Sequence, residues 1–535
     1  MQRRDLLRWM ALTPLSLVDG GLGRMAFALA PGDPDVELVL TARPGTVALL
    51  PGAPTRVWQF EGRVLRGPAT ALQPLPGSYL GPTIRVRRGQ RVRIRFHNAL
   101  PEPSIVHWHG LDVPEQADGH PRFAVPSGGD YAYDFTVTNR AGAYWYHPHP
   151  HMQTAVQVYQ GLAGLFLVTD DEESALQLPA GSYELPIVLQ DRQIDAQNQW
   201  VYGAGSLVPN VGGAATRPMA GMRGMQGGMG TMMAAMQGWV GDRVFVSGRL
   251  QPTIDVARAT YRLRVLNGSN ARTYQLAWSD GTPLTVIGTD GGLLEEPLTM
   301  PSLVLAPAQR ADLIVDLSGR AAGSTVTLRS LPFSDADLGM DGMMAGPARQ
   351  GAALTLVTLR VGQAAGPSWR VPARLTAALP PLPAPEGVRR IPLEMSMMQW
   401  TIAGRVFEMT DVSADETVRA GVTQVWEFIN SPTQVGMGMG MGGMVMAHPV
   451  HLHGRQFRVL SRTGGAPTSL RAGLQDRGWL DTILVLPGET VRVQVTFSSH
   501  PGLYLYHCHI LEHEDMGMMR NFRIVPASAT PAAGA

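Results

Sequence analysis

The stretch AGAYWYHPH (141–149) has a counterpart near the other end of the chain, PGLYLYHCH (501–509). In both, a glycine precedes aromatic and apolar residues, and the stretch ends in His-x-His. Segments of this content are typical of β-strands with a buried face. Because the pattern occurs twice, we predict two equivalent β-sheet units, one near each end of the chain.

A second repeat indicates three units. In each copy apolar residues alternate with polar ones and an Asn closes the strand, as in RVRIRFHNAL (91–100), YRLRVLNGSN (261–270) and VTQVWEFINS (422–431). Many short strands, together with 61 Gly and 42 Pro, favour an all-β fold of Greek-key sandwiches. We expect these domains at 36–170, 171–365 and 390–527, with a Pro/Ala-rich linker at 366–389.

The composition argues against some classes of partner. The 535 residues carry a net charge of +1, which gives no reason to expect nucleic acid as a partner. After the first thirty residues no apolar run is long enough to cross a bilayer, so we expect no membrane insertion. We expect a monomer.

Residues 1–30 have the features of an export signal. Arg3 and Arg4 precede a modestly apolar stretch, and Ala28-Leu29-Ala30 resembles the small-residue cleavage site of a signal peptide. This arrangement is typical of a twin-arginine signal. We therefore predict that the mature protein works in the periplasm or outside the cell.

Four His-x-His pairs form the main candidate site. They are His107/His109, His147/His149, His451/His453 and His507/His509. Residues i and i+2 of a strand point to the same face, so each pair presents two imidazoles side by side. Neutral imidazole binds copper, zinc, iron and nickel. The middle domain contains no histidine, so we expect the first and third domains to carry this chemistry.

The single cysteine, Cys508, favours one metal among these. A thiolate, two imidazoles and a weakly bound thioether form a blue-copper electron-transfer site. Cys508, His513 and Met518 come from one loop, and His448 comes from an earlier strand end. Zinc would take four strong ligands and would not need the methionine. We therefore predict copper at these four residues.

The motifs HWHG, YHPH, HPVHLHG and HCHILEHEDMGM together resemble the signature of the three-domain multicopper oxidases, over nearly the whole mature chain. The resemblance implies three cupredoxin-like domains and four copper ions. It implies that type 1 copper binds His448, Cys508, His513 and Met518, and type 2 copper His107 and His451. It implies that the type 3 copper pair binds His109, His147, His149, His453, His507 and His509.

The resemblance also implies a reaction. One-electron donors would be oxidised at type 1 copper, and dioxygen would be reduced by four electrons to water. Electrons would pass from Cys508 through His507 and His509. Two acids would assist proton supply, Asp118 in EQADG and Glu512 in HILEHED, with Asp112 as a competing candidate for the first.

The 27 methionines are concentrated in a few segments, chiefly 217–236, 340–344, 395–398 and 437–446. Many of them lie among glycines, so they are poor candidates for core residues. Thioether is a soft ligand that favours Cu(I). Aligned with the bacterial cuprous oxidases of copper efflux systems, Met397, Met444 and Met446 fall on substrate-copper positions, although that group carries Asp at position 444.

We therefore predict an enzyme that oxidises Cu(I), and also phenols or aromatic amines, with dioxygen as acceptor and a role in copper tolerance. One alternative is a laccase that acts mainly on phenols. Another is a copper-sequestering protein that keeps the fold without the activity. Bacterial laccases share the resemblance, so the motifs alone leave the substrate open.

Overall fold

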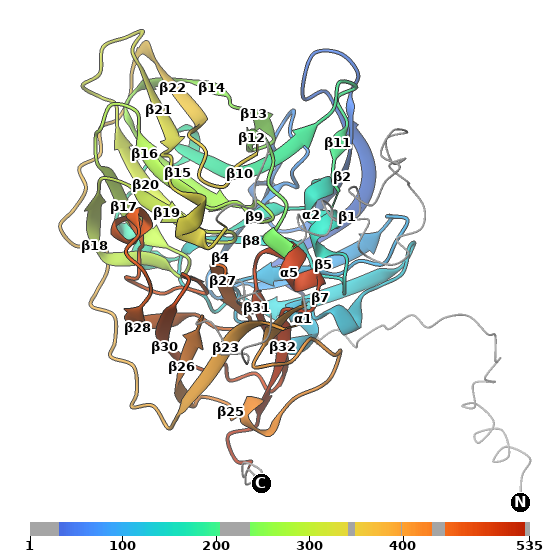
Figure 1. The fold of residues 1–535 in the computed structure, drawn as a ribbon. Coiled ribbons are helices and arrows are strands. Elements are labelled where there is room, and N and C mark those ends of the chain that lie inside the picture. The colour runs from blue at the N-terminus through green and yellow to red at the C-terminus, as the bar shows by residue number, and fades with distance from the viewer. Residues whose placement is uncertain (1–31, 204–235, 341–347, 397–398, 431–444, 530–535) are drawn as a thin grey trace, which may run out of the picture.

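The computed structural model describes residues 32–203, 236–340, 348–396, 399–430 and 445–529. β-Strands account for 47% of the structure and helices are few, which confirms the all-β prediction. The predicted export signal and all but the last residue of segment 217–236 lie outside the described residues. The described strands form three units, coloured blue to cyan, green to yellow and orange to red in Figure 1.

The first unit is a two-sheet sandwich. Its strands are β1 (Val36–Val47), β2 (Thr55–Arg66), β3 (Leu72–Gln73), β4 (Thr83–Arg87), β5 (Arg91–Asn98), β6 (Val106–His109), β7 (Asp130–Thr136), β8 (Gly142–Pro148) and β9 (Gly164–Thr169). One sheet has the order β2-β1-β5-β7 and the other β3-β4-β9-β8-β6. Alternate residues of β1 are buried, so this strand turns one face towards the core.

The second unit also has two sheets. Its strands are β10 (Glu184–Ile194), β11 (Trp200–Val201), β12 (Arg243–Val246), β13 (Arg249–Leu250), β14 (Thr253–Arg258), β15 (Thr260–Asn267), β16 (Tyr274–Trp278), β17 (Leu284–Thr289), β18 (Gly292–Met300), β19 (Leu303–Leu305), β20 (Arg310–Asp316), β21 (Thr325–Ser330) and β22 (Leu354–Ala365). The larger sheet runs β13-β12-β10-β15-β20-β17-β18, with β11 paired to β10, and the smaller runs β14-β22-β21-β16-β19.

The third unit repeats the sandwich. Its strands are β23 (Val388–Ser396), β24 (Gln399–Ile402), β25 (Thr417–Arg419), β26 (Thr423–Ile429), β27 (His448–Leu452), β28 (Phe457–Gly464), β29 (Thr482–Val485), β30 (Glu489–Thr496), β31 (Gly502–Cys508) and β32 (Met519–Val525). The sheets have the orders β24-β23-β26-β30-β28 and β25-β32-β31-β27-β29.

Short helices connect the strands. The α-helices are α1 (Glu115–Asp118), α2 (Thr154–Gln160), α3 (Asp171–Ala175) and α5 (Leu511–Asp515). The 3-10 helices are η1 (Ala69–Ala71), η2 (Pro121–Phe123), η3 (Gly181–Tyr183), η5 (Asp335–Leu338), η6 (Ala414–Glu416) and η7 (Ser469–Gly473). Both carboxylate oxygens of Asp515 in α5 accept hydrogen bonds from the first backbone N–H groups of α2, each at 2.9 Å. This contact docks the third unit on the first, near the middle of Figure 1.

The three units repeat one strand arrangement. In each, the first long strand pairs in parallel with a strand that leads into the repeated Asn, and that strand pairs antiparallel with a later one. The triplets are β1-β5-β7, β10-β15-β20 and β23-β26-β30. The strand repeat predicted from the sequence therefore has a direct counterpart in the sheets.

The repeated asparagines, Asn98, Asn267 and Asn430, are buried and bind backbone carbonyls in the same manner. The side-chain amide of Asn98 donates to three carbonyls and that of Asn267 to two. Asn430 donates to the carbonyls of Met446, Val485 and Leu486 at 2.6 to 3.2 Å. Each amide thus ties its strand end to the neighbouring loops.

Asn430→Ala is expected to lower the free energy of unfolding of the copper-free protein by about 2–3 kcal/mol, because buried carbonyls lose their donor. Chemical denaturation followed by circular dichroism measures this difference. Gln197→Ala is the control, since Gln197 is an exposed amide whose loss water can replace. Equal effects of the two substitutions would contradict the structural role of Asn430.

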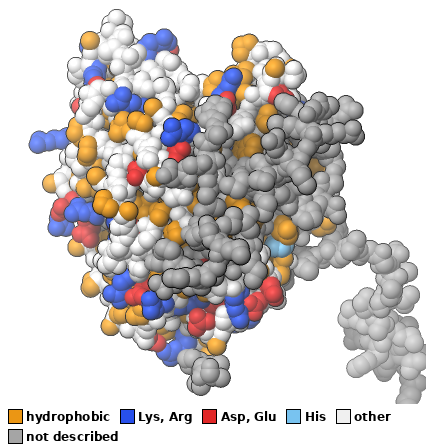
Figure 2. Space-filling model, in the orientation of Figure 1, with side chains coloured by type: hydrophobic (Ala, Val, Ile, Leu, Met, Phe, Trp, Pro, Cys, Tyr) orange, Lys and Arg blue, Asp and Glu red, His pale blue; other side chains and the backbone are white. Residues whose placement is uncertain are grey.

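The described surface carries mixed charge. Figure 2 shows acidic and basic side chains interspersed on one face, without a large patch of one sign among the coloured atoms. Among the described residues, no helix has the length and apolar content needed to cross a membrane.

Candidate metal centre

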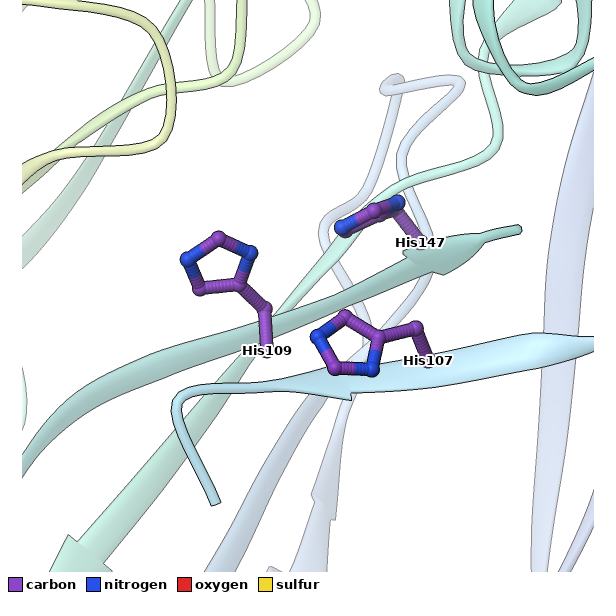
Figure 3. Close-up of side chains that lie close together, drawn as sticks. All are labelled: His107, His109 and His147. Carbon is purple, nitrogen blue, oxygen red and sulfur yellow. The ribbon is translucent and has the colours of Figure 1, made fainter. Parts of the chain in front are cut away.

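Eight buried imidazoles meet between the first and third units. The pairing of β6 with β8 places His107 opposite His147, and the pairing of β27 with β31 places His451 opposite His507. Figure 3 shows that His107 and His109 from one strand and His147 from its neighbour project to the same side. The second member of the other three pairs follows its strand directly.

The imidazoles of the two units interdigitate. The ring of His107 stacks on that of His453 at 3.8 Å between centroids, and His109 stacks on His451 at 3.6 Å. The Nε2 atom of His507 lies 3.1 Å from Nε2 of His453 and 3.4 Å from Nε2 of His149. Several groups of three ring nitrogens therefore lie close enough to share one metal ion.

A second group lies around the single cysteine. The sulfur of Cys508 lies 3.5 Å from Nδ1 of His448 and 3.6 Å from Nδ1 of His513. The backbone of Met518 accepts a hydrogen bond from Cys508 and donates one to His513, and the Met518 side chain is buried. The chain thus brings together the four residues predicted for a blue-copper site. Their roles as ligands stay a prediction.

Comparison with known proteins identifies the family. Models described as multicopper oxidase match residues 59–173, 218–324 and 390–528. The chain is 31% identical to the multicopper oxidase mco of Staphylococcus haemolyticus, over 84% of this chain and 83% of that protein. The chain belongs to the multicopper oxidase family. The predicted resemblance and the oxidoreductase class are thereby confirmed.

Further relatives support this identification. A laccase of Bacillus subtilis is 29% identical over 85% of this chain and 90% of the laccase. The crystal structure of the McoA multicopper oxidase of Aquifex aeolicus is 31% identical and covers 92% of this chain and 96% of that one, with a TM-score of 0.72. These similarities confirm the cupredoxin-like fold and imply copper as the cofactor of this multicopper oxidase.

The histidines of this multicopper oxidase fit copper. Buried ring nitrogens without a hydrogen-bond partner include Nε2 of His107, His147 and His451, Nδ1 of His109, and both nitrogens of His509. A buried polar atom without a partner is costly, and imidazole nitrogen is a good copper ligand. The open nitrogens are therefore suited to metal ligation.

Burial also keeps these imidazoles neutral. It lowers the pKa of all eight, to about 3 for His147 and about 4 for His507. A neutral imidazole offers a free lone pair to a metal. Burial raises the pKa of the Cys508 thiol, so a bound cation is needed to stabilise the thiolate at neutral pH.

Asp118, at the end of α1, contacts the cluster directly. Its carboxylate accepts a hydrogen bond from Nδ1 of His453 at 2.8 Å, and its carbonyl accepts one from Nδ1 of His107. The competing candidate, Asp112, instead binds Ser498 and Arg455. The structure therefore places Asp118, rather than Asp112, at the imidazoles.

The acids of α5 differ in orientation. Glu512 accepts hydrogen bonds from Asn270 and Tyr202, each at 2.9 Å. Glu514, which the sequence analysis did not select, lies 3.2 Å from Nδ1 of His507 and 3.5 Å from Nδ1 of His149. Burial is the main cause that raises the pKa of both carboxyls. Glu514 is thus a further functional candidate. In the sequence, the one signal for it is its position directly after His513.

Asp481 is a second residue that the sequence analysis missed. One of its carboxylate oxygens lies 3.1 Å from Nε2 of His109, and its carbonyl accepts a hydrogen bond from Nδ1 of His451 at 2.8 Å. It precedes β29 in the sequence WLDTILV, which contains no metal-binding motif.

Proposed function

We propose that this multicopper oxidase oxidises Cu(I), with dioxygen as electron acceptor, and thereby contributes to copper tolerance. The observation that carries this proposal is that methionines share the hydrophobic cluster of Cys508 and that another methionine, Met236, contacts the ligand candidate His513 through its backbone. Met340, Met446 and Met518 are buried in the hydrophobic cluster that contains Cys508, and Met395 packs against that cluster. Met446 lies two residues before His448.

The end of the Met-rich segment 217–236 reaches the same site. The carbonyl of Met236 accepts hydrogen bonds from Nε2 of His513 at 2.9 Å and from the Trp400 indole at 3.1 Å. The Trp400 ring lies 4.8 Å from the rings of both His448 and His513. The last residue of segment 217–236 and a residue just after segment 395–398 therefore contact the predicted electron-entry site. Met397 and Met444 lie outside the described residues, and Met446 is the described member of the proposed substrate site.

We assign the resident copper as follows. His448, Cys508, His513 and Met518 would hold type 1 copper, and His107 and His451 type 2 copper. The other six cluster histidines would hold the type 3 pair. When bound, copper supplies one-electron redox chemistry. Cys508 is bonded along the chain to His507 and His509, so the protein itself links the two sites.

The chain's own acids would supply protons and orient ligands. Asp118 holds His453 in one tautomer, with Nδ1 donating and Nε2 turned towards the cluster. Glu512 and Glu514 are alternative proton donors, and the contacts of Glu514 with two cluster imidazoles favour it. Residues 1–30 would direct export to the periplasm or beyond the cell.

Oxygen uptake tests the proposed substrate. The copper-loaded enzyme receives Cu(I) as sole donor, and separately a simple phenol with and without added Cu(II). Efficient uptake with Cu(I), and a phenol rate that rises with Cu(II), is the result expected for a cuprous oxidase. Poor uptake with Cu(I), with a phenol rate indifferent to Cu(II), would instead indicate a laccase, the activity of the Bacillus relative.

Met446→Leu is expected to raise KM for Cu(I) about tenfold, equivalent to about 1.4 kcal/mol of binding. Leucine keeps the volume but lacks the thioether. KM for a phenol should stay unchanged, because phenol needs no sulfur ligand. Met340→Leu is the matched control, a buried methionine of the same cluster that is not a proposed ligand. If KM for Cu(I) were the same in both variants and in wild type, Met446 would not be part of a substrate site.

A further inference from the structure

Arg310, the first residue of β20, joins all three units beside the histidine cluster. Its Nε donates to the carbonyl of Ala143 in the first unit at 2.9 Å, and Nη1 to the carbonyl of Ala308 at 3.0 Å. Its two terminal nitrogens bind the two carboxylate oxygens of Asp481 in the third unit. The side chain is fully buried. This fork fixes the plane of the Asp481 carboxylate.

Asp290, which follows β17, is a second residue of the middle unit that fixes the position of Asp481. One of its oxygens accepts the backbone N–H of Arg310 at 2.8 Å. The other faces the backbone N–H groups of Asp481 and Thr482 at 3.2 and 3.3 Å. The second unit, which has no histidine of its own in the centre, thus fixes both the side chain and the backbone of Asp481.

Asp481 in turn contacts two stacked imidazoles through different groups. Its carboxylate accepts from Nε2 of His109, and its carbonyl accepts from Nδ1 of His451. The open nitrogen is therefore Nδ1 in His109 but Nε2 in His451, in agreement with the unpartnered atoms of these rings. The hydroxyl of the next residue, Thr482, faces the same two nitrogens at 3.4 and 3.3 Å. Asp481 and its neighbour thus leave opposite ligand nitrogens open in the two rings.

We propose that Arg310 and Asp290 are positioning residues for the copper cluster, acting through Asp481 to fix which nitrogens of His109 and His451 bind metal. Hydrogen bonds of this kind from outside the ligand set orient metal-binding histidines. The role rests on the assignment of copper to these histidines and not on the proposed substrate.

Gly110 of HWHG gives independent support. It has φ +87°, and a Cβ atom there would lie 2.5 Å from an oxygen of Asp481 and 2.9 Å from a nitrogen of Arg310. The glycine after His109 therefore leaves the space that the Arg310–Asp481 pair occupies. The motif and the ion pair fit each other sterically.

The test compares copper retention in full-length wild type, Arg310→Lys and Asp481→Asn. Each copper-loaded protein is dialysed against graded EDTA, and retained copper is measured by atomic absorption beside the blue absorption of the Cys508 site. Loss of such outer contacts weakens metal affinity about 10- to 100-fold. We therefore expect non-blue copper to leave both variants at about 10- to 100-fold lower EDTA, with the blue absorption retained.

Arg272→Lys is the matched control. Arg272 is also a buried arginine bound to one aspartate, Asp191, and to backbone carbonyls, without contact to the cluster. If Arg310→Lys does not fold, copper retention by Asp481→Asn alone tests the proposal. Copper retention equal to wild type, or an equal loss from Arg272→Lys, would overturn the positioning role. Wild type that holds no copper would overturn the copper assignment and this role with it, whereas failure to oxidise Cu(I) would affect only the substrate.

Discussion

Replacing Cys508 with serine is expected to remove the blue colour and the oxygen uptake of the copper-loaded enzyme together. A hydroxyl is a much poorer copper ligand than a thiolate. The sulfur is also the atom that faces Nδ1 of both His448 and His513. Since Cys508 lies between two cluster histidines, the substitution also removes the sulfur through which a metal at this site would be joined to the chain segment that carries them. Visible absorption and an oxygen electrode measure both effects.

Val450→Ala is the control for lost packing at the same place. Val450 is buried and pairs with Cys508 across β27 and β31, yet it offers no ligand atom. This variant should keep its colour and its oxygen uptake. If Cys508→Ser protected copper-stressed cells as well as wild type does, the chain would be a sequestering protein. We expect that protection to be lost.

Glu514→Gln is expected to lower turnover about 100-fold, within the range for loss of a positioned proton donor. Its carboxylate lies beside Nδ1 of His507 and His149, whereas glutamine keeps the shape without an exchangeable acidic proton. The blue absorption should persist. Among the contacts that the structure describes, the Glu514 side chain has none with Cys508, His448 or His513. Steady-state oxygen uptake with saturating donor measures the loss.

Glu512→Gln is the matched control on the same helix. Glu512 is equally buried and binds Asn270 and Tyr202, so its substitution should cost activity less than that of Glu514. A larger loss from Glu512→Gln would favour the assignment made from the sequence. Equal and small losses would mean that neither carboxyl supplies the protons.

The strand-borne part of the centre could be predicted because strand geometry is simple. Two histidines in His-x-His share a strand face, as His107 and His109 do on β6, and the register of β6 with β8 places His147 opposite His107. Helical residues are harder to place. Glu512 and Glu514 are about 200° apart around a helix, so a motif that names both does not say which one faces the cluster.

Other contacts have no local signal at all. Arg310 and Asp290 come from the unit that lacks histidine, and their role depends on how that unit docks against Asp481. The contact of Met236 with His513 is made by a backbone carbonyl, which every residue possesses. Contacts of these two kinds depend on tertiary packing rather than on a motif.

The division of the eight imidazoles between β6/β8 and β27/β31 has a consequence for biosynthesis. During translation the first four imidazoles emerge well before the other four, with the whole middle unit still to be made. A nascent or truncated chain offers only half of the cluster, and the Asp515 contact with α2 cannot yet form. With these histidines as the proposed copper ligands, full metal loading would have to wait for a finished and folded polypeptide, so that cofactor content would report on the integrity of the chain.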